Sequence, residues 1–361
     1  MENRISLLAH EMVVHFSTET SCLCSRDHFV FRYCFQSQQL RFVCRIPPKD
    51  SGLLGLLKDV LARSWLGQRL SKKAGLSHVM QLDSGLIVII YDRVYVCDLN
   101  QGAKVATPIE SKEFFDFAPP LRNGYAIHPA SQAVYFGEYL NGHTRNIRVF
   151  RIRPNDMKLE ICFEFDRSEI KHIHAISYDP FRRRLWITTG DLDHESSFYY
   201  TDDEFLTVHR FAGGDQTWRA ISLLFDETGM EWGMDAGKDA PKEAINKLYR
   251  YDFSTEARVE LAVIGNPAYY ASQMMDGTAY LATTFEPGRL QDTPEEAALW
   301  HRDMKHQWTK VKSFRYVYAP RQGVSKYGHL LLPAGKCSPD NFLMTPVNVE
   351  SNHYSLVKLQ P

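Results

Sequence analysis

Residues 171–191 read KHIHAISYDPFRRRLWITTGD and predict a β-hairpin with titratable groups at its open end. An apolar strand covers about 173–178, a polar turn with proline and three arginines follows, and a β-branched and aromatic strand returns over 185–189. Because a hairpin brings its two ends together, we expect His172 and His174 beside Asp191. Base, acid and metal-ligand chemistry would then share one edge.

The chain repeats this pattern at a nearly constant period. Five segments each contain a polar or aromatic residue, a short apolar strand, a turn, a stronger strand and an acid. They are HVMQLDSGLIVIIYD from His78, YAIHPASQAVYFGE from Tyr125, HAISYDPFRRRLWITTGD from His174, RAISLLFDETGMEWGMD from Arg219 and YASQMMDGTAYLATTFE from Tyr270. A sixth segment begins at Gln322 and ends in a lysine. Successive starts lie 45–52 residues apart with further strands between them, which is typical of β-propeller blades.

The sequence therefore predicts an all-β protein with one β-propeller domain over 1–361. Residues 11–47 read as short strands and would form a seventh blade; six blades is the alternative if these strands only complete the last one. An insertion at 51–75 breaks the pattern, because residues 53–70 carry an apolar stripe at helical spacing. This predicts an amphipathic helix that either covers the core or lies in the plane of a membrane.

The composition limits which kinds of binding partner and which cellular location are expected. With 42 basic and 43 acidic residues, the chain lacks the basic excess expected of a nucleic-acid-binding protein. Its N-terminal residues lack a signal-peptide core, and no apolar run is long enough to span a membrane. The seven cysteines show no zinc-binding spacing. We expect a cytoplasmic protein, with peripheral membrane contact available through Leu53–Leu70.

Degenerate Asp-box motifs follow the third predicted strand of several repeats. Residues 201–208, TDDEFLTV, keep the hydroxyl, acid and threonine of the pattern Ser/Thr-x-Asp-x-Gly-x-Thr-Trp, and residues 301–308, HRDMKHQW, keep its acid and tryptophan. With the block from 120 to 260, they resemble the sialidase-like propeller superfamily with bacterial neuraminidase repeats. The resemblance implies Asp-boxes on the outer side of the blades and a carbohydrate as ligand. The arginine triad and the tyrosine–glutamate pair of sialidases are not identified in this sequence.

Propeller topology predicts where the polar residues gather. The first strand of each blade lines the axial channel, so the residues that open these strands should ring one mouth, and the acids that end the second strands should form a wider ring. The predicted inner ring is His78, Tyr125, His174, Arg219, Tyr270 and Gln322. The predicted outer ring is Asp92, Glu138, Asp191, Asp235 and Glu286. Convergent polar groups in a concave mouth indicate a binding site.

These residue types suit an acidic polysaccharide or glycoconjugate. Arg219 can pair with a sugar carboxylate, and aromatic side chains can stack on sugar rings. The predicted substrate-binding residues are Arg219, Tyr270, Tyr125, Tyr139, His78, Trp218, Trp232 and Gln322. The predicted catalytic residues are Asp191, Asp235 and Glu138 for a hydrolase, and His172 and His174 with a tyrosine for a uronate lyase. The sequence thus predicts cleavage of a glycosidic bond by hydrolysis or elimination.

Several alternatives remain open from the sequence. No cofactor is predicted, although His172, His174 and Asp191 could hold a divalent metal ion. The histidines could equally be structural, and acids that end strands often cap turns. A non-catalytic platform for proteins or glycans, or a metal-dependent enzyme such as a lactonase, would use the same fold. For a cytoplasmic enzyme, a role in surface (exopolysaccharide) biosynthesis is the expectation.

Overall fold

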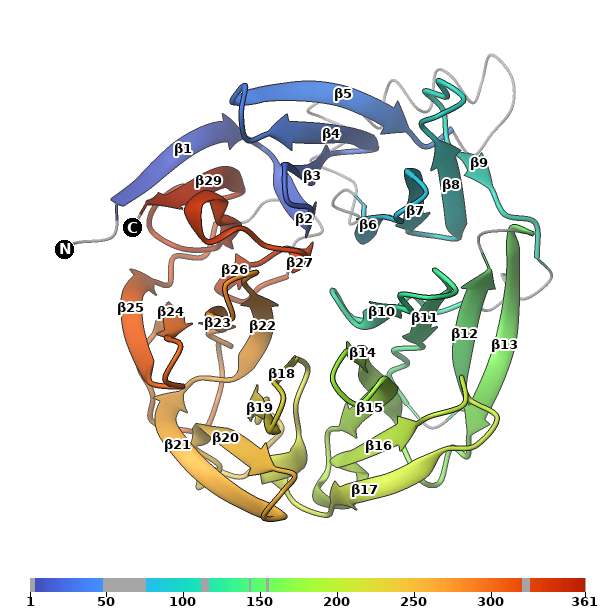
Figure 1. The fold of residues 1–361 in the computed structure, drawn as a ribbon. Coiled ribbons are helices and arrows are strands. Elements are labelled where there is room, and N and C mark those ends of the chain that lie inside the picture. Colours follow the sequence, from blue (N-terminus) through green and yellow to red (C-terminus); the bar gives the residue numbers. More distant parts are fainter. Residues whose placement is uncertain are drawn as a thin grey trace.

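The computed structural model describes residues 4–47, 76–111, 117–142, 144–153, 156–319 and 325–360. Seven sheets are arranged as blades around a central axis (Figure 1). This confirms the predicted all-β class and the seven-bladed propeller.

Successive blades follow one another along the chain. The blade nearest the N-terminus contains β2 (Val13–Ser17), β3 (Ser21–Arg26), β4 (Phe29–Cys34) and β5 (Gln39–Arg45), with β27 (Ala334–Gly335) added to its inner edge. The next contains β6 (His78–Gln81), β7 (Leu86–Ile90), β8 (Val94–Asp98) and β9 (Thr107–Pro108). The third contains β10 (Tyr125–Ile127), β11 (Val134–Gly137), β12 (Ile147–Arg153) and β13 (Lys158–Phe165).

The remaining blades repeat this order. The fourth contains β14 (His172–Asp179), β15 (Arg184–Gly190), β16 (Ser197–Thr201) and β17 (His209–Gly213). The fifth contains β18 (Leu223–Phe225), β19 (Gly229–Gly233), β20 (Asn246–Asp252) and β21 (Ala257–Gly265). The sixth contains β22 (Ala268–Gln273), β23 (Ala279–Thr283), β24 (Glu296–Arg302) and β25 (Trp308–Arg315). The last contains β26 (His329–Leu331), β28 (Leu343–Val347), β29 (Ser355–Gln360) and β1 (Arg4–His10).

The two ends of the chain close the ring together. Strand β1 is the outermost strand of the last blade and pairs antiparallel with β29, from Arg4 opposite Gln360 to His10 opposite Ser355. The sequence left open whether the N-terminal strands complete the last blade or form a blade of their own, and the structure shows both. Strand β1 completes the last blade, and β2–β5 form a blade of their own, which gives seven.

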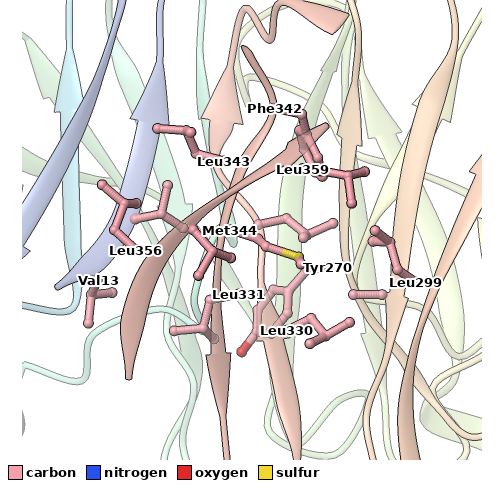
Figure 2. Close-up of a cluster of buried hydrophobic side chains, with 14 of the residues drawn as sticks. Val13, Tyr270, Leu299, Leu330, Leu331, Phe342, Leu343, Met344, Leu356 and Leu359 are labelled. Carbon is pink, nitrogen blue, oxygen red and sulfur yellow. The ribbon is translucent and has the colours of Figure 1, made fainter. Parts of the chain in front are cut away.

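The blades are held together by apolar side chains on the faces that meet. All five residues of β7, LIVII, are buried, as are all five of β19, because neighbouring blades cover both faces of these strands. The outermost strand β21 is instead largely exposed. Figure 2 shows one such contact, where residues of β2, β22 and β24 meet residues of β26, β28 and β29; it labels Val13, Tyr270, Leu299, Leu330, Leu331, Phe342, Leu343, Met344, Leu356 and Leu359. Burial of these groups stabilises the closure of the ring.

The prediction of an inserted amphipathic helix needs correction. No α-helix is present in the parts of the chain that the structure describes, and the predicted segment 53–70, in the insertion 51–75, lies outside them. The helical segments within the described ranges are short 3-10 helices: η2 (Asp193–Glu195), η3 (Gln216–Trp218) and η4 (Pro339–Asn341). None of the helices in these ranges has the length and apolar character needed to cross a bilayer.

Three of the inner strands carry a β-bulge near the same end. The pairing register shifts around His15 in β2, around His174 in β14 and around Tyr269 in β22, so each of these residues is the extra one on its strand. A bulge interrupts the alternation of side chains and re-aims the extra one. The bulges therefore change which side chains of these strands reach the channel.

Candidate functional site

A cluster of ionisable side chains lies at the open end of the β14–β15 hairpin. Nε2 of His172 and Nε2 of His174 lie 3.3 and 3.4 Å from Oδ1 of Asp191, and 3.2 Å from one another. All three residues are buried. A Cβ atom on Gly190 would lie 2.6 Å from Cε1 of His174, so glycine before Asp191 permits this close approach. The predicted meeting of the two histidines with Asp191 is observed.

The far nitrogen of each histidine determines which tautomer is present. Nδ1 of His172 contacts the backbone carbonyl of Leu140 at 2.8 Å, and Nδ1 of His174 contacts that of Ala220 at 3.2 Å. A carbonyl only accepts hydrogen bonds, so both Nδ1 atoms carry the proton in the neutral rings. Both Nε2 atoms then point bare lone pairs at each other and at a carboxylate oxygen. The three atoms have no proton to share among themselves, an arrangement that a metal cation would stabilise, although Oδ1 of Asp191 already contacts the Arg219 guanidinium at 3.0 Å.

The spacing of these three atoms fits a metal shell. Neighbouring ligands in tetrahedral or octahedral shells with bonds of about 2.1 Å lie about 3.0–3.4 Å apart, and the three observed separations are 3.2, 3.3 and 3.4 Å. Histidine ligands usually donate their other N–H to a carbonyl or carboxylate, as both do here. Imidazole with carboxylate is a donor set that suits divalent transition metals. The residues present therefore fit such an ion.

Two cations hold Asp191 in its ionised form. Lys171 Nζ lies 2.8 Å from Asp191 Oδ2, and Arg219 Nη2 lies 3.0 Å from Asp191 Oδ1. Burial alone would raise the pKa of Asp191, but the positive charge of Arg219 outweighs it and holds that pKa well below its usual range. For His174, burial lowers the pKa to about 4 despite the nearby carboxylate. The imidazole of His174 is thus neutral and available as a ligand at neutral pH.

Asp235 is the opposite case to Asp191. Burial raises the pKa of Asp235 well above its usual range, and the charge of Arg219 only partly offsets this. Its Oδ2 lies 3.7 Å from Arg219 Nε and 3.8 Å from His174 Nδ1, while its Oδ1 is buried without a hydrogen-bond partner in the described structure. Two carboxyl groups in one cluster therefore have pKa values pushed apart, a pattern typical of acid–base pairs.

Aromatic side chains border this cluster. The ring of Tyr139 lies over that of His172 with centroids 4.1 Å apart. The hydroxyl of Tyr269 donates a hydrogen bond to Oε1 of Glu286, whose Oε2 accepts from the backbone of Lys238 at 2.9 Å. The sequence predicted Tyr270 as the inner-ring residue of this blade, because Tyr270 opens its repeat. The bulge at Tyr269 brings that neighbour to Glu286 instead, and no sequence signal marks a bulge here.

The other predicted inner-ring residues surround a separate group, the basic half of the channel. It is built around Arg122, in the loop before β10. The side chains around it are His15, His78, Tyr125, Tyr270 and His329. The polar ring at the mouth is thus divided. Acids and candidate metal ligands come from β14, β15 and the segments around β18, whereas β2, β6, β10 and β26 supply the basic half.

Several predicted site residues lie apart from both groups. Glu138 is fully buried and accepts hydrogen bonds from Arg145 and Arg148. Trp218 and Trp232 stack on each other with centroids 5.1 Å apart inside the hydrophobic core. Both rings therefore pack against protein. Gln322 lies outside the described residues.

Buried neutral histidines in the basic half make stability depend on pH. Burial, with the charge of Arg122, lowers the pKa of His78 and His329 to about 3. Because the unfolded value is about 6.5, the unfolded chain takes up protons first as the pH falls, and native stability is lost between about pH 6.5 and 3. We expect His329→Gln to flatten this loss by up to about 1.4 kcal/mol per pH unit. Urea unfolding at several pH values measures the free energy of unfolding of the variant and of the parent protein. An equal dependence of this free energy on pH in both proteins would contradict the prediction.

Comparisons by sequence return no relative. No protein-family model matches the chain, and no curated protein matches it. Solved structures do match in fold. An oligogalacturonate lyase from Vibrio parahaemolyticus has a TM-score of 0.60 at 10% identity, over 100% of this chain and 97% of that one. An oligogalacturonate lyase in complex with manganese also scores 0.60, at 9% identity over 99% and 92%. U3-55K scores 0.55 at 9% identity over 99% and 98%. At such identities these likenesses show the propeller fold.

The comparisons do not confirm the sialidase-like superfamily within the propellers. The turns that resemble Asp-boxes nevertheless lie where that resemblance implies, between the third and fourth strands of a blade. Asp203 accepts a hydrogen bond from the backbone of Thr207 at 2.9 Å, and Asp303 accepts one from that of Gln307 at 2.9 Å. These acids stabilise turns on the outer side of the blades and lie outside the channel cluster.

Proposed function

We propose that the protein holds a divalent cation with His172, His174 and Asp191 and cleaves a glycosidic bond of an acidic oligosaccharide by elimination. The observation that carries this is the convergence of two bare Nε2 atoms and one carboxylate oxygen at 3.2–3.4 Å. The two oligogalacturonate lyases of similar fold, one in complex with manganese, support the choice of substrate class.

Elimination next to a uronate requires that the negative charge of the sugar carboxylate be neutralised, so that the proton beside it becomes acidic enough to pass to solvent water while the glycosidic C–O bond breaks and its oxygen takes up a proton. The cation, when bound, would supply most of that neutralisation. Lys171, whose side chain is partly exposed, can add to it from beside Asp191. Arg219 acts differently from the prediction that it binds the sugar, because its guanidinium is engaged by Asp191 and by Asp239 at 3.0 Å each. It keeps Asp191 ionised and in place.

Asp235 is suited to donate the proton that the leaving oxygen needs. A carboxyl group whose pKa is raised by burial keeps its proton to a higher pH than a free one, which suits a general acid. Its Oδ1 is buried and makes no hydrogen bond in the described structure, so the protein leaves its hydrogen-bonding capacity unused. The neighbouring Asp239 is exposed and serves as a matched control, because it also pairs with Arg219.

We therefore expect Asp235→Asn to lower the turnover rate by about 100-fold or more while cation affinity stays within about threefold, since general acids contribute roughly 10²–10⁴ in rate. Asp239→Asn should keep most of the activity. Initial rates and cation titrations of the two variants check this. Equal activity of Asp235→Asn and the parent protein would show that Asp235 is not the proton donor.

A second reaction uses the same residues. Asp191, whose pKa is lowered, and Asp235, whose pKa is raised, also match the base and the acid of a glycoside hydrolase. Incubation of the Mn²⁺-loaded protein with a panel of acidic polysaccharides and oligosaccharides separates the two. New reducing ends together with ultraviolet absorbance of unsaturated uronate would support elimination, and reducing ends alone would indicate hydrolysis. No cleavage of the whole panel would contradict both and favour a non-catalytic glycan-binding platform.

A further inference from the structure

The loop before β10 crosses the end of the axial channel. The side chain of Asn123 donates a hydrogen bond at 3.0 Å to the carbonyl of Leu332, the residue that follows β26. The guanidinium of Arg122 donates to the carbonyls of Val14 in β2 and of Ser77, just before β6. A Cβ atom on Gly124 would lie 2.7 Å from the carbonyl oxygen of His174, so the loop also touches β14. In Figure 1 the inner strands β2, β6, β10, β14, β18 and β22 stand around a central axis. The loop thus carries Arg122 into the channel.

Arg122 has no acidic partner among the described residues. The ionisable groups that act on the pKa of Arg122 are Tyr270, Tyr125, Tyr354 and Cys24. Burial lowers the pKa of Arg122 itself, and its charge in turn lowers the pKa of the buried His15, His78 and His329. Arg122 is partly buried, and an arginine in such surroundings is normally matched by a carboxylate, because an unpaired charge removed from water is costly. Among the described residues, the positive charge of the basic half is therefore not balanced by a carboxylate.

Three polar atoms around this charge lack hydrogen-bond partners in the described structure. They are Nε of Arg122, the hydroxyl of Tyr125 and Nδ1 of His78. Tyr125 is 8% exposed and His78 is 2% exposed, and their rings meet edge-on with centroids 5.7 Å apart. Nε2 of His78 contacts the carbonyl of Pro120 at 3.2 Å, so Nδ1 is an acceptor in the neutral ring. Two donors and one acceptor are therefore unsatisfied next to an unmatched positive charge.

We propose that the basic half of the channel binds an oxyanion that also carries a hydroxyl group. The oxyanion accepts from the guanidinium of Arg122 and the hydroxyl of Tyr125, and its hydroxyl donates to Nδ1 of His78. A sugar carboxylate with its neighbouring hydroxyl and a hydrogen phosphate ion both have this chemistry. The charges of both Arg122 and Asp235 act on the pKa of Tyr270, so this one side chain lies close to the proposed anion site and to the proposed cation site. The inference stands without the proposed reaction, because it concerns binding alone.

Binding of inorganic phosphate and of galacturonate to the full-length protein, treated with EDTA to remove cations, tests the site. Isothermal titration is expected to show binding of at least one of these anions to the parent protein. Arg122→Gln should weaken that binding about tenfold or more. The matched control is Arg41→Gln, on the exposed face of the outer strand β5, which should bind like the parent. Tyr125→Phe, which removes only the unpartnered hydroxyl, should weaken binding about threefold or more.

The outcomes separate the two sources of the anion. Arg122-dependent binding of phosphate and galacturonate alike supports a site for free oxyanions, and Arg122-dependent binding of galacturonate alone supports a subsite for a sugar carboxylate. Should Arg122→Gln fail to fold, because Arg122 also anchors the loop, Tyr125→Phe decides the question. Absence of binding to the parent protein, or equal binding by the parent and the folded variants, would overturn the proposal. Activity plays no part in the readout, so failure of the proposed reaction leaves this result interpretable.

Discussion

His174→Gln is expected to reduce the affinity for Mn²⁺ by about 100-fold or more and to abolish cleavage of acidic oligosaccharides. The change removes one of three ligand atoms that lie 3.2–3.4 Å apart, and the two that remain are too few for tight binding. Glutamine has nearly the volume of histidine and keeps a polar group near the carbonyl of Ala220, so the fold should survive. Equilibrium dialysis with Mn²⁺ and initial rates measure the two effects.

His209→Gln is the matched control, because His209 is exposed on the outer strand β17. It should bind Mn²⁺ and cleave substrate like the parent protein. Loss of cleavage in His174→Gln with unchanged Mn²⁺ affinity would show that His174 acts on the substrate and not as a metal ligand. Unchanged cleavage would contradict any role of the cluster in catalysis.

Glu138→Ala is expected to lower the free energy of unfolding by about 3–5 kcal/mol, the usual effect of removing one partner from a buried charge pair. Glu138 is fully buried and accepts from Arg148 Nε at 2.9 Å, Arg148 Nη2 at 2.7 Å and Arg145 Nη2 at 2.7 Å. Its backbone also joins the third and fourth blades, because the amide of Ile173 donates to its carbonyl at 3.1 Å. Urea unfolding at neutral pH measures the loss.

The control in the same sheet is Glu160→Ala. Glu160 pairs with Arg151 and Arg153 on the partly exposed outer strands β12 and β13, where an ion pair contributes less than about 1 kcal/mol. Burial raises the pKa of Glu138, but the two arginines lower it more strongly, so the net pKa is lowered. The stability that ionised Glu138 contributes is therefore present above about pH 4 and is lost as the pH falls further. A Glu138→Ala protein of parental stability but without activity would restore the prediction that Glu138 is catalytic.

The parts of the site that could be predicted from the sequence are those formed within one hairpin. His172 pairs with Gly190 across β14 and β15, so its contact with Asp191 follows from local chain geometry. The repeat period predicted the seven blades for a similar reason, because each blade is a local unit of four strands. Asp191 and Glu138 hold equivalent places in the repeat, yet Glu138 accepts hydrogen bonds from Arg148 of β12 and from Arg145 in the segment before it. That difference depends on which neighbours each blade happens to supply.

The parts that could not be predicted depend on bulges, loops and contacts between blades. Tyr269 reaches Glu286 because of a bulge that leaves no periodic signal. Arg122 lies in an irregular loop before β10, and only the assembled ring shows that this loop bridges the channel. Trp232 was predicted to stack on sugars, since an aromatic residue near the mouth suits that role. Its place against Phe198 of the neighbouring blade, with centroids 5.0 Å apart, makes it part of the core.

The most direct test of the cation site is anomalous X-ray scattering from crystals of the protein soaked in Mn²⁺. The geometry predicts one strong peak bounded by Nε2 of His172, Nε2 of His174 and Oδ1 of Asp191, about 2.1 Å from each. A second group, formed by Asp226, Glu231 and His306, should stay without a peak, because Nδ1 of His306 lies 2.6 Å from Oε1 of Glu231, a hydrogen-bond distance shorter than the spacing of neighbouring metal ligands. A peak at that outer group alone, or no peak at the histidine pair, would contradict the proposed cation site.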